Sequence, residues 1–376
     1  AEHLAEAMAL FADLPDSAAA AAASGELARL HMIEYRTDEA VVAARASYQL
    51  ADRLGLADHA ASARITEAMA RYLGGDPKAY ADMEAALQTC REQKLPSLRR
   101  AAHNLSVIAT AEGQLARAIE LQEEREAADG GRLHQVLSHS EEAVRAYFTG
   151  DWTTLLQAAE AYLDVDGAET TDWDLQLRGQ RAWIRLLCGE PPGEEVTHWV
   201  DSAERSGFAR LRLIAYAHGA FCRLLEGESS AAVQLVDLLA SEWPLVRNTS
   251  VEEWLPVAGH ASALLAEQVG IAPAEAIVQV AASVPLRTPW AVATEQVALG
   301  ACVLARDEPA AAAGQFAEAV RGYDAIGAVS DAVLTAVWAA RAYRAAGDDA
   351  AAAPYLDRVR AFAVRYGATR LAEMVA

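Results

Sequence analysis

Residues 101–125 read AAHNLSVIATAEGQLARAIELQEER and contain one complete structural repeat of this chain. Apolar residues before the Glu112-Gly113-Gln114 turn recur at the spacing of one helical face, and Ala118 and Leu121 continue such a face on a second helix. Glycine adopts the left-handed conformation that ends a helix, and an alanine five residues later is small enough to let the second helix lie against the first. The stretch therefore predicts two antiparallel helices joined by a tight turn.

The same turn signal recurs about every 38 residues along the chain, which indicates a stacked helical array. The fifth residue past the turn is again alanine at Ala232 and Ala352. The signals fall at Tyr35-Arg36, Gly75-Asp76, Gly113-Gln114, Gly150-Asp151, Gly189-Glu190, Gly227-Glu228, Arg306-Asp307 and Gly347-Asp348, and the spacing is blurred only near Gly270. No alternating strand pattern accompanies them. The chain is predicted to be all-α, with roughly eighteen to twenty helices.

Composition and charge limit the classes of function. The 376 residues are 53% hydrophobic but only 7% aromatic, as expected for helices packed closely through small side chains. A net charge of −21 would repel a phosphate backbone over most of the surface, because nucleic-acid binding depends on clustered Lys and Arg. We therefore expect no direct nucleic-acid binding by this chain.

The cysteines and the apolar segments indicate a cytoplasmic protein. Cys90, Cys188, Cys222 and Cys302 lie far apart in apolar helical stretches, so they are expected to be core thiols in a reducing compartment. No stretch approaches the roughly 18 uninterrupted apolar residues of a membrane helix. The first residues show neither an initiator methionine nor a secretion signal, and we expect the chain to begin inside a longer protein.

The pattern is expected to run as one domain from residue 1 to 376, with an irregular region at 243–288. Four prolines and a polar stretch at 247–250 disturb the spacing there. Such a region could be a hinge between two superhelical halves or a longer loop between repeats, since helical arrays often carry insertions on one face.

The order Asn104-Leu105-Ser106, Gly113 and Ala118 resembles the tetratricopeptide signature, and the best match extends from Ala57 to Ala128. The period is longer than the usual repeat of about 34 residues. The resemblance implies a right-handed superhelical solenoid of about nine helix-turn-helix repeats.

Long-helix arrays of this kind resemble the sensor arm of bacterial signal-transduction ATPases, which include maltose-activator-like regulators, large LuxR-type regulators and cyclase-linked relatives. Ala1 to Pro15 looks like the first helix after the ATPase module, and Ala361 to Glu373 is similar to the last helix before a carboxy-terminal effector. In that family the arm receives an inducer or a partner. The chain contains neither a phosphate-binding loop nor a helix-turn-helix segment, so ATP hydrolysis and DNA reading would belong to other segments.

Candidate catalytic and metal-binding groups do not form convincing patterns. His134 and His139 are five residues apart, which places them on diverging faces of a helix. The acidic stretch at 164–169 lacks the glycine position and the closing glutamate of a calcium loop, and is better explained as a solvated loop. No nucleophile motif occurs, although a triad assembled from distant residues would escape this test. We expect no enzyme activity, no metal and no cofactor.

Aromatic residues are concentrated in the middle third of the chain. Alignment of the turns places Tyr147, Trp183 and Phe221 at equivalent positions of successive repeats. The candidate binding residues on the inner curve are His103, Glu141, Tyr147, Gln180, Trp183, His218 and Phe221. Aromatic side chains mixed with a few polar groups are typical of a binding groove, but the same rings could be packed between helices.

The expected function is recognition. A peptide, a protein or a small-molecule effector would bind the concave surface, in the setting of a regulator arm, and an oligomer is compatible with this expectation. Two alternatives are a structural scaffold that assembles a complex through its acidic exterior, and an enzyme built on a helical toroid, which would show a deep pocket with coupled titrating residues.

Overall fold

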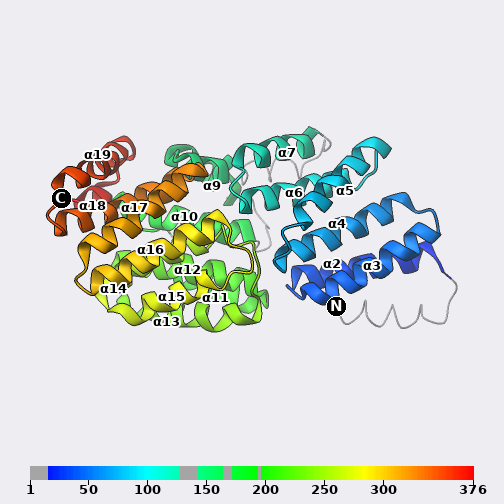
Figure 1. The fold of residues 1–376 in the computed structure, drawn as a ribbon, viewed down its shortest axis with the longest axis horizontal. Helices are drawn as coiled ribbons and strands as arrows, with labels where there is room; N and C mark the ends of the chain where they lie inside the picture. The colour runs from blue at the N-terminus through cyan, green and yellow to red at the C-terminus, as the bar shows by residue number, and fades with distance from the viewer. Residues whose placement is uncertain (1–15, 128–141, 164–171, 194–195) are drawn as a thin grey trace. The chain divides into compact units, whose positions relative to one another are not determined.

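The computed structural model describes residues 16–127, 142–163, 172–193 and 196–376, and all regular structure in these ranges is helical. The first residues of the chain, Glu141, the pair His134 and His139, and the acidic stretch 164–169 lie outside the described residues. Consecutive helices contact each other as antiparallel hairpins (Figure 1). The predicted all-α solenoid is therefore confirmed. None of the described helices is long and apolar enough to cross a membrane.

The chain packs as two compact units, which are described separately. The first consists of residues 1–131 and the segment Val246–Ser250. Its helices are α2 (Ala18–Ile33), α3 (Thr37–Arg53), α4 (Ala57–Leu73), α5 (Ala79–Gln93), α6 (Leu98–Ala111) and α7 (Leu115–Ala127). Each helix contacts the next, and α2, α4 and α6 also contact in sequence, as in a stack of hairpins.

The second unit consists of residues 132–245 and 251–376. It begins with helical residues 142–149, followed by α9 (Trp152–Leu163), α10 (Asp172–Leu187), α11 (Val196–Ser206), α12 (Ala209–Glu226), α13 (Ser229–Glu242) and the 3₁₀ turn η1 (Trp243–Leu245). The remaining helices are α14 (Leu255–Gln268), α15 (Ile271–Ala282), α16 (Pro289–Ala305), α17 (Pro309–Ala325), α18 (Val329–Ala345), α19 (Asp349–Tyr366) and α20 (Thr369–Glu373). Here α10, α12, α14 and α16 contact in sequence.

The predicted turns end the helices as expected. Gly113, Gly150 and Gly347 have φ of 72°, 74° and 78°, in the left-handed region. In each turn the following amide donates to a carbonyl five residues back, as Gln114 does to Ala109 at 2.8 Å. The small residues predicted five positions later, such as Ala118 and Ala352, are buried. Turn chemistry and side-chain size together set the hairpin.

The irregular region 243–288 is ordered in the structure. Thr249 is buried in the first unit, where its amide donates to the carbonyl of Leu73 at 3.1 Å and its hydroxyl donates to the carbonyl of Tyr72 at 2.9 Å. Residues from 251 onward form α14 and α15 of the second unit. Within this region only Val246–Ser250 belongs to the first unit, and the residues on both sides of it belong to the second. A hinge motion there stays a prediction.

The second unit closes on itself, because its last helices contact its first ones. The ring of Phe362 on α19 lies 4.8 Å from that of Trp152 on α9. Thr369 on α20 donates to the carbonyl of Cys188 at 3.3 Å, and Arg370 donates to the carbonyl of Leu225 at 2.5 Å. These contacts join segments about 145 to 210 residues apart in the chain. The inner side of this unit is filled with side chains.

Gly150 offers a direct test of this closure. A β-carbon at Gly150 would lie 2.6 Å from Cγ1 of Val329 on α18, whereas one at Gly347 would meet no atom within 4 Å. Both glycines have nearly the same positive φ. We expect Gly347→Ala to cost about 1 kcal/mol through backbone strain alone, and Gly150→Ala to cost about 1 to 3 kcal/mol more through overpacking. Thermal or denaturant unfolding of the two variants measures the difference, and equal losses would contradict the closure.

Candidate functional site

Three of the predicted binding residues meet in the interior of the second unit. Tyr147, Trp183 on α10 and Phe221 on α12 follow one another with ring centroids 6.1 and 5.7 Å apart, in edge-to-face contact. The rings are 3%, 0% and 3% exposed. The structure therefore brings them together as the repeat alignment predicted, but places them between packed helices, which is the alternative that the sequence left open.

Gln180 and His218 are buried beside these rings. Nε2 of His218 donates to the carbonyl of Glu253 at 3.0 Å, so the neutral ring keeps its second nitrogen unprotonated. Burial lowers the pKa of His218 from 6.5 to about 4, with smaller opposing effects of the Glu253 carbonyl and Asp331. A β-carbon at Gly179 would lie 2.5 Å from His218, so glycine permits this close approach of α10 and α12.

Of the other two predicted residues, only His103 lies in the described part of the chain, and it is not part of this group. His103 lies on α6 of the first unit and is half-buried, with its Nδ1 3.4 Å from a guanidinium nitrogen of Arg125. Glu141 is outside the described residues. The described members of the predicted set are therefore divided between the two units, and Tyr147, Gln180, Trp183, His218 and Phe221 belong to the second.

The sequence analysis missed the polar residues that hold this interior together. Asp331 on α18 is fully buried, and its Oδ1 accepts from the hydroxyl of Tyr147 at 2.7 Å and from Nε2 of His260 at 3.0 Å. Its neighbour Ser330 accepts from the indole of Trp152 at 3.0 Å. We call the following set the closure cluster: Tyr147, Trp152, Trp183, Phe221, His260, Ser330 and Asp331. A lone acidic residue in the apolar stretch 328–340 was the available signal.

The closure cluster has the residue types of an acid-base site but not its accessibility. All seven members are buried. Burial raises the pKa of Tyr147 well above its usual value, and the adjacent Asp331 carboxylate adds to this effect. The hydroxyl therefore stays protonated and acts as a donor to Asp331. The arrangement is suited to joining the first and last helices of the unit, because buried carboxylates require such donors.

The cysteine thiols and the potential metal ligands of the described residues also show no arrangement that would activate them. The four cysteines are free, and burial raises the pKa of Cys90 to about 11. A thiol with that pKa is largely protonated at pH 7. No three His, Cys, Asp or Glu side chains converge as metal ligands in the part of the chain that the structure describes.

A cleft of about 460 Å³ lies across α14, α16 and α18, the first helices of three successive hairpins. Its lining is mostly small and apolar, and comprises Ala263, Ala266, Glu267, Ala301, Leu304, Ala305, Trp338, Arg341 and Ala345. Arg341 pairs with Glu267 through both guanidinium nitrogens, and its Cζ stands 4.6 Å from the ring centroid of Trp338. The cleft thus has an apolar floor, one aromatic wall and a charged edge, which are the features of a ligand site.

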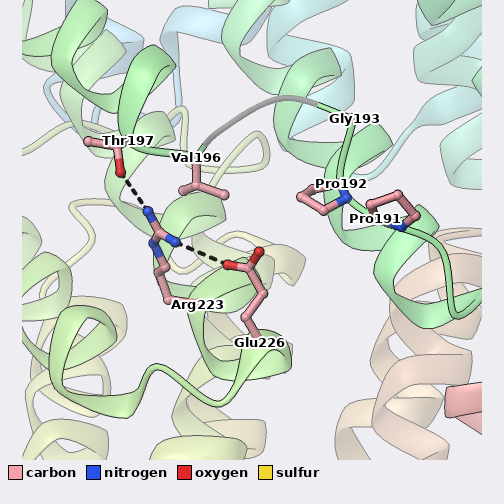
Figure 2. Close-up of a pocket in the computed structure, with 7 residues that line it drawn as sticks. All are labelled: Pro191, Pro192, Gly193, Val196, Thr197, Arg223 and Glu226. Atoms are coloured by element: carbon pink, nitrogen blue, oxygen red, sulfur yellow. Dashed lines mark hydrogen bonds and ion pairs between the residues drawn. The ribbon is translucent and has the colours of Figure 1, made fainter.

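A second cleft, of about 570 Å³, lies beside the end of α10. Figure 2 shows Arg223 held between Thr197 and Glu226, with Pro191 and Pro192 across the cleft. Arg223 donates to Thr197 at 2.6 Å and to Glu226 at 3.2 Å. Because this cleft adjoins residues 194–195, which lie outside the described ranges, no binding site is proposed at it.

Comparisons with known proteins do not identify a function. No protein-family model matches the chain, and no curated protein matches it. Among solved structures the chain is similar to the TPR domain of P58(IPK), with a TM-score of 0.26 and 14% identity over 94% of this chain and 98% of that one. A similarity at this level carries no argument about binding. The description of the chain as a tetratricopeptide-like helical repeat depends on its own hairpins and turns.

Substitutions at Trp183 distinguish packing from binding. Because the indole is fully buried, we expect Trp183→Ala to cost about 3 to 5 kcal/mol of stability. Its Nε1 has no hydrogen-bond partner among the described residues, so Trp183→Phe should keep most of the stability. Thermal melting of both variants measures this. A role of these rings in binding stays a prediction, and an unchanged melt of Trp183→Ala with weakened partner binding would favour it over packing.

His218 should make stability depend on pH. Its pKa of about 4 in the folded protein lies below the usual 6.5, so the unfolded chain binds more protons between these values. This contribution to stability is full above pH 6.5 and is lost as the pH falls towards 4. The variant His218→Gln can still donate to the Glu253 carbonyl. We expect its melting temperature to fall less from pH 7 to pH 5 than that of the wild type. The matched control is His198→Gln at an exposed position of α11, which should follow the wild type.

Proposed function

We propose that the chain is a non-catalytic binding domain whose ligand, a segment of a partner protein, occupies the cleft across α14, α16 and α18. The observation that carries this proposal is that three successive repeats each contribute residues to the lining of the cleft. Residues near the carboxyl ends of three successive first helices supply small side chains, with Trp338 as the aromatic wall. Stacked helical repeats commonly bind along a surface to which neighbouring repeats each contribute.

The cleft is also the better candidate because part of its lining is accessible, while Ala263, Ala301 and Trp338 at its base are buried. Ala305 and Ala345 are exposed, and Arg341 is half-buried. The closure cluster, in contrast, would have to separate packed helices before a ligand could reach it, which would expose several aromatic rings at a cost of about 25 cal/mol for each Å² of apolar surface. Binding at the cleft needs no such opening.

The setting we propose is the sensor arm of a larger bacterial regulator. The support is the resemblance of the repeat class, and ATP hydrolysis would belong to other segments, because these 376 residues contain no phosphate-binding loop. In this proposal an ATPase module lies before Ala1 in the complete gene product. A scaffold that assembles a complex is the second candidate, and the net charge of −21 is the observation that favours it, since a strongly charged exterior can select partners of opposite charge.

The cleft can be tested by blocking it with a side chain. We expect peptides selected from a random display library on the wild-type chain to bind Ala345→Trp at least about 10-fold more weakly, because the indole would fill the space that an anchoring side chain needs. Ala353→Trp, at an exposed position of α19 outside the cleft, is the matched control and should bind as the wild type does. Affinities from calorimetry or fluorescence polarisation measure the effect. Selected peptides that bind all three proteins equally would refute the proposal.

A further inference from the structure

The cleft across α14, α16 and α18 is empty of side chains for a simple reason. Five of its nine lining residues are alanines, whose side chains fill little space. A volume of about 460 Å³ lies within the usual range of ligand pockets, roughly 300 to 1,000 Å³. It accommodates one large apolar side chain together with the backbone that carries it.

One carboxylate lines this cleft, and exposed carboxylates closely follow its lining residues in the chain. Glu267 is part of the lining and is exposed. The lining residues Ala305 and Ala345 are each followed within four positions by a pair of exposed acidic residues. These pairs are Asp307 and Glu308 after α16, and Asp348 and Asp349 after α18.

The cations near the cleft are already committed to partners within the protein. Arg341 pairs with Glu267 and stacks on Trp338. Arg306 pairs with Glu275 at 2.6 Å. The guanidinium of Arg344 donates to the carbonyl of Ala376 at 3.0 Å.

Two further features of the chain favour a positively charged ligand at this cleft. Five of the lining residues lie in the last turn of their helices, where the backbone dipole is negative, namely Ala266, Glu267, Leu304, Ala305 and Ala345. The whole chain carries a net charge of −21, which attracts basic molecules over distances limited by salt screening. Local carboxylates, helix ends and overall charge thus act in the same direction.

We propose that the cleft recognises a basic segment of a partner protein, in which one large apolar side chain is flanked by Lys or Arg. The apolar side chain fills the alanine-lined space, and the flanking cations contact the acidic turns after α16 and α18. This inference rests on the proposed binding function and adds the chemistry of the partner. An acidic segment would face the four exposed carboxylates of the turns after α16 and α18, whereas Arg341 and Glu267 in the lining already pair with each other.

The test uses four synthetic peptides and three forms of the whole chain. The peptides carry a central Phe or Ala, flanked on both sides by Lys or by Glu. The proteins are the wild type, Ala345→Trp and the control Ala353→Trp, which have the same charge. Fluorescence polarisation at about 0.15 M salt, where the Debye length is about 8 Å, suppresses long-range attraction to the acidic surface.

We expect the Phe peptide with Lys flanks to bind at least 10-fold more tightly than the other three, and Ala345→Trp alone to remove this preference. Equal binding of the Phe peptides with Lys and Glu flanks, sensitive to Ala345→Trp, would overturn the charge inference while leaving the cleft as a binding site. The Lys peptides with Phe and with Ala could instead bind equally, and Ala345→Trp could leave this binding unchanged. That result would show general attraction to an acidic protein and would overturn both the charge inference and the cleft as a binding site. Binding of no peptide to any protein would also overturn the inference.

Discussion

The close contact of neighbouring helices through alanine is the constraint on which the rest of the structure depends. Buried alanines such as Ala118, Ala232 and Ala352 let the second helix of a hairpin lie against the first, and glycine in the left-handed region reverses the chain just before it. Each hairpin buries too little surface to be stable alone, so stability comes from stacking on its neighbours. Turn chemistry, side-chain size and stacking therefore all favour one architecture.

The second unit adds long-range contacts to this local pattern. Asp331 accepts hydrogen bonds from Tyr147 and His260, and Trp152 binds Ser330, so α18 is joined to the segment that begins the unit. Unpaired, these buried polar groups would each cost free energy, which makes the correct pairing a strong requirement of the closed arrangement. The interior of the second unit is consequently occupied by aromatic rings of the chain itself.

Small side chains have a second consequence at the carboxyl ends of α14, α16 and α18. Alanines that allow close packing where helices touch leave a cleft where the helices diverge, with Trp338 as its wall and Glu267 at its edge. The acidic residues in the following turns belong to the same repeat pattern that punctuates the chain, as in Arg306-Asp307 and Gly347-Asp348. The architecture therefore places apolar space and negative charge next to each other without any dedicated loop.

The sequence by itself determined the helical class, the positions of the turns and the alignment of Tyr147, Trp183 and Phe221, because these follow from local periodicity and from the backbone freedom of glycine. Only the tertiary structure decided that these rings face packed helices, since their burial depends on contacts such as that of Tyr147 with Asp331, 184 residues further along the chain. The division into two units and the cleft across three hairpins were likewise not predictable from local patterns. Both arise from which helices meet at a distance, and a spacing of residues along one chain does not record that.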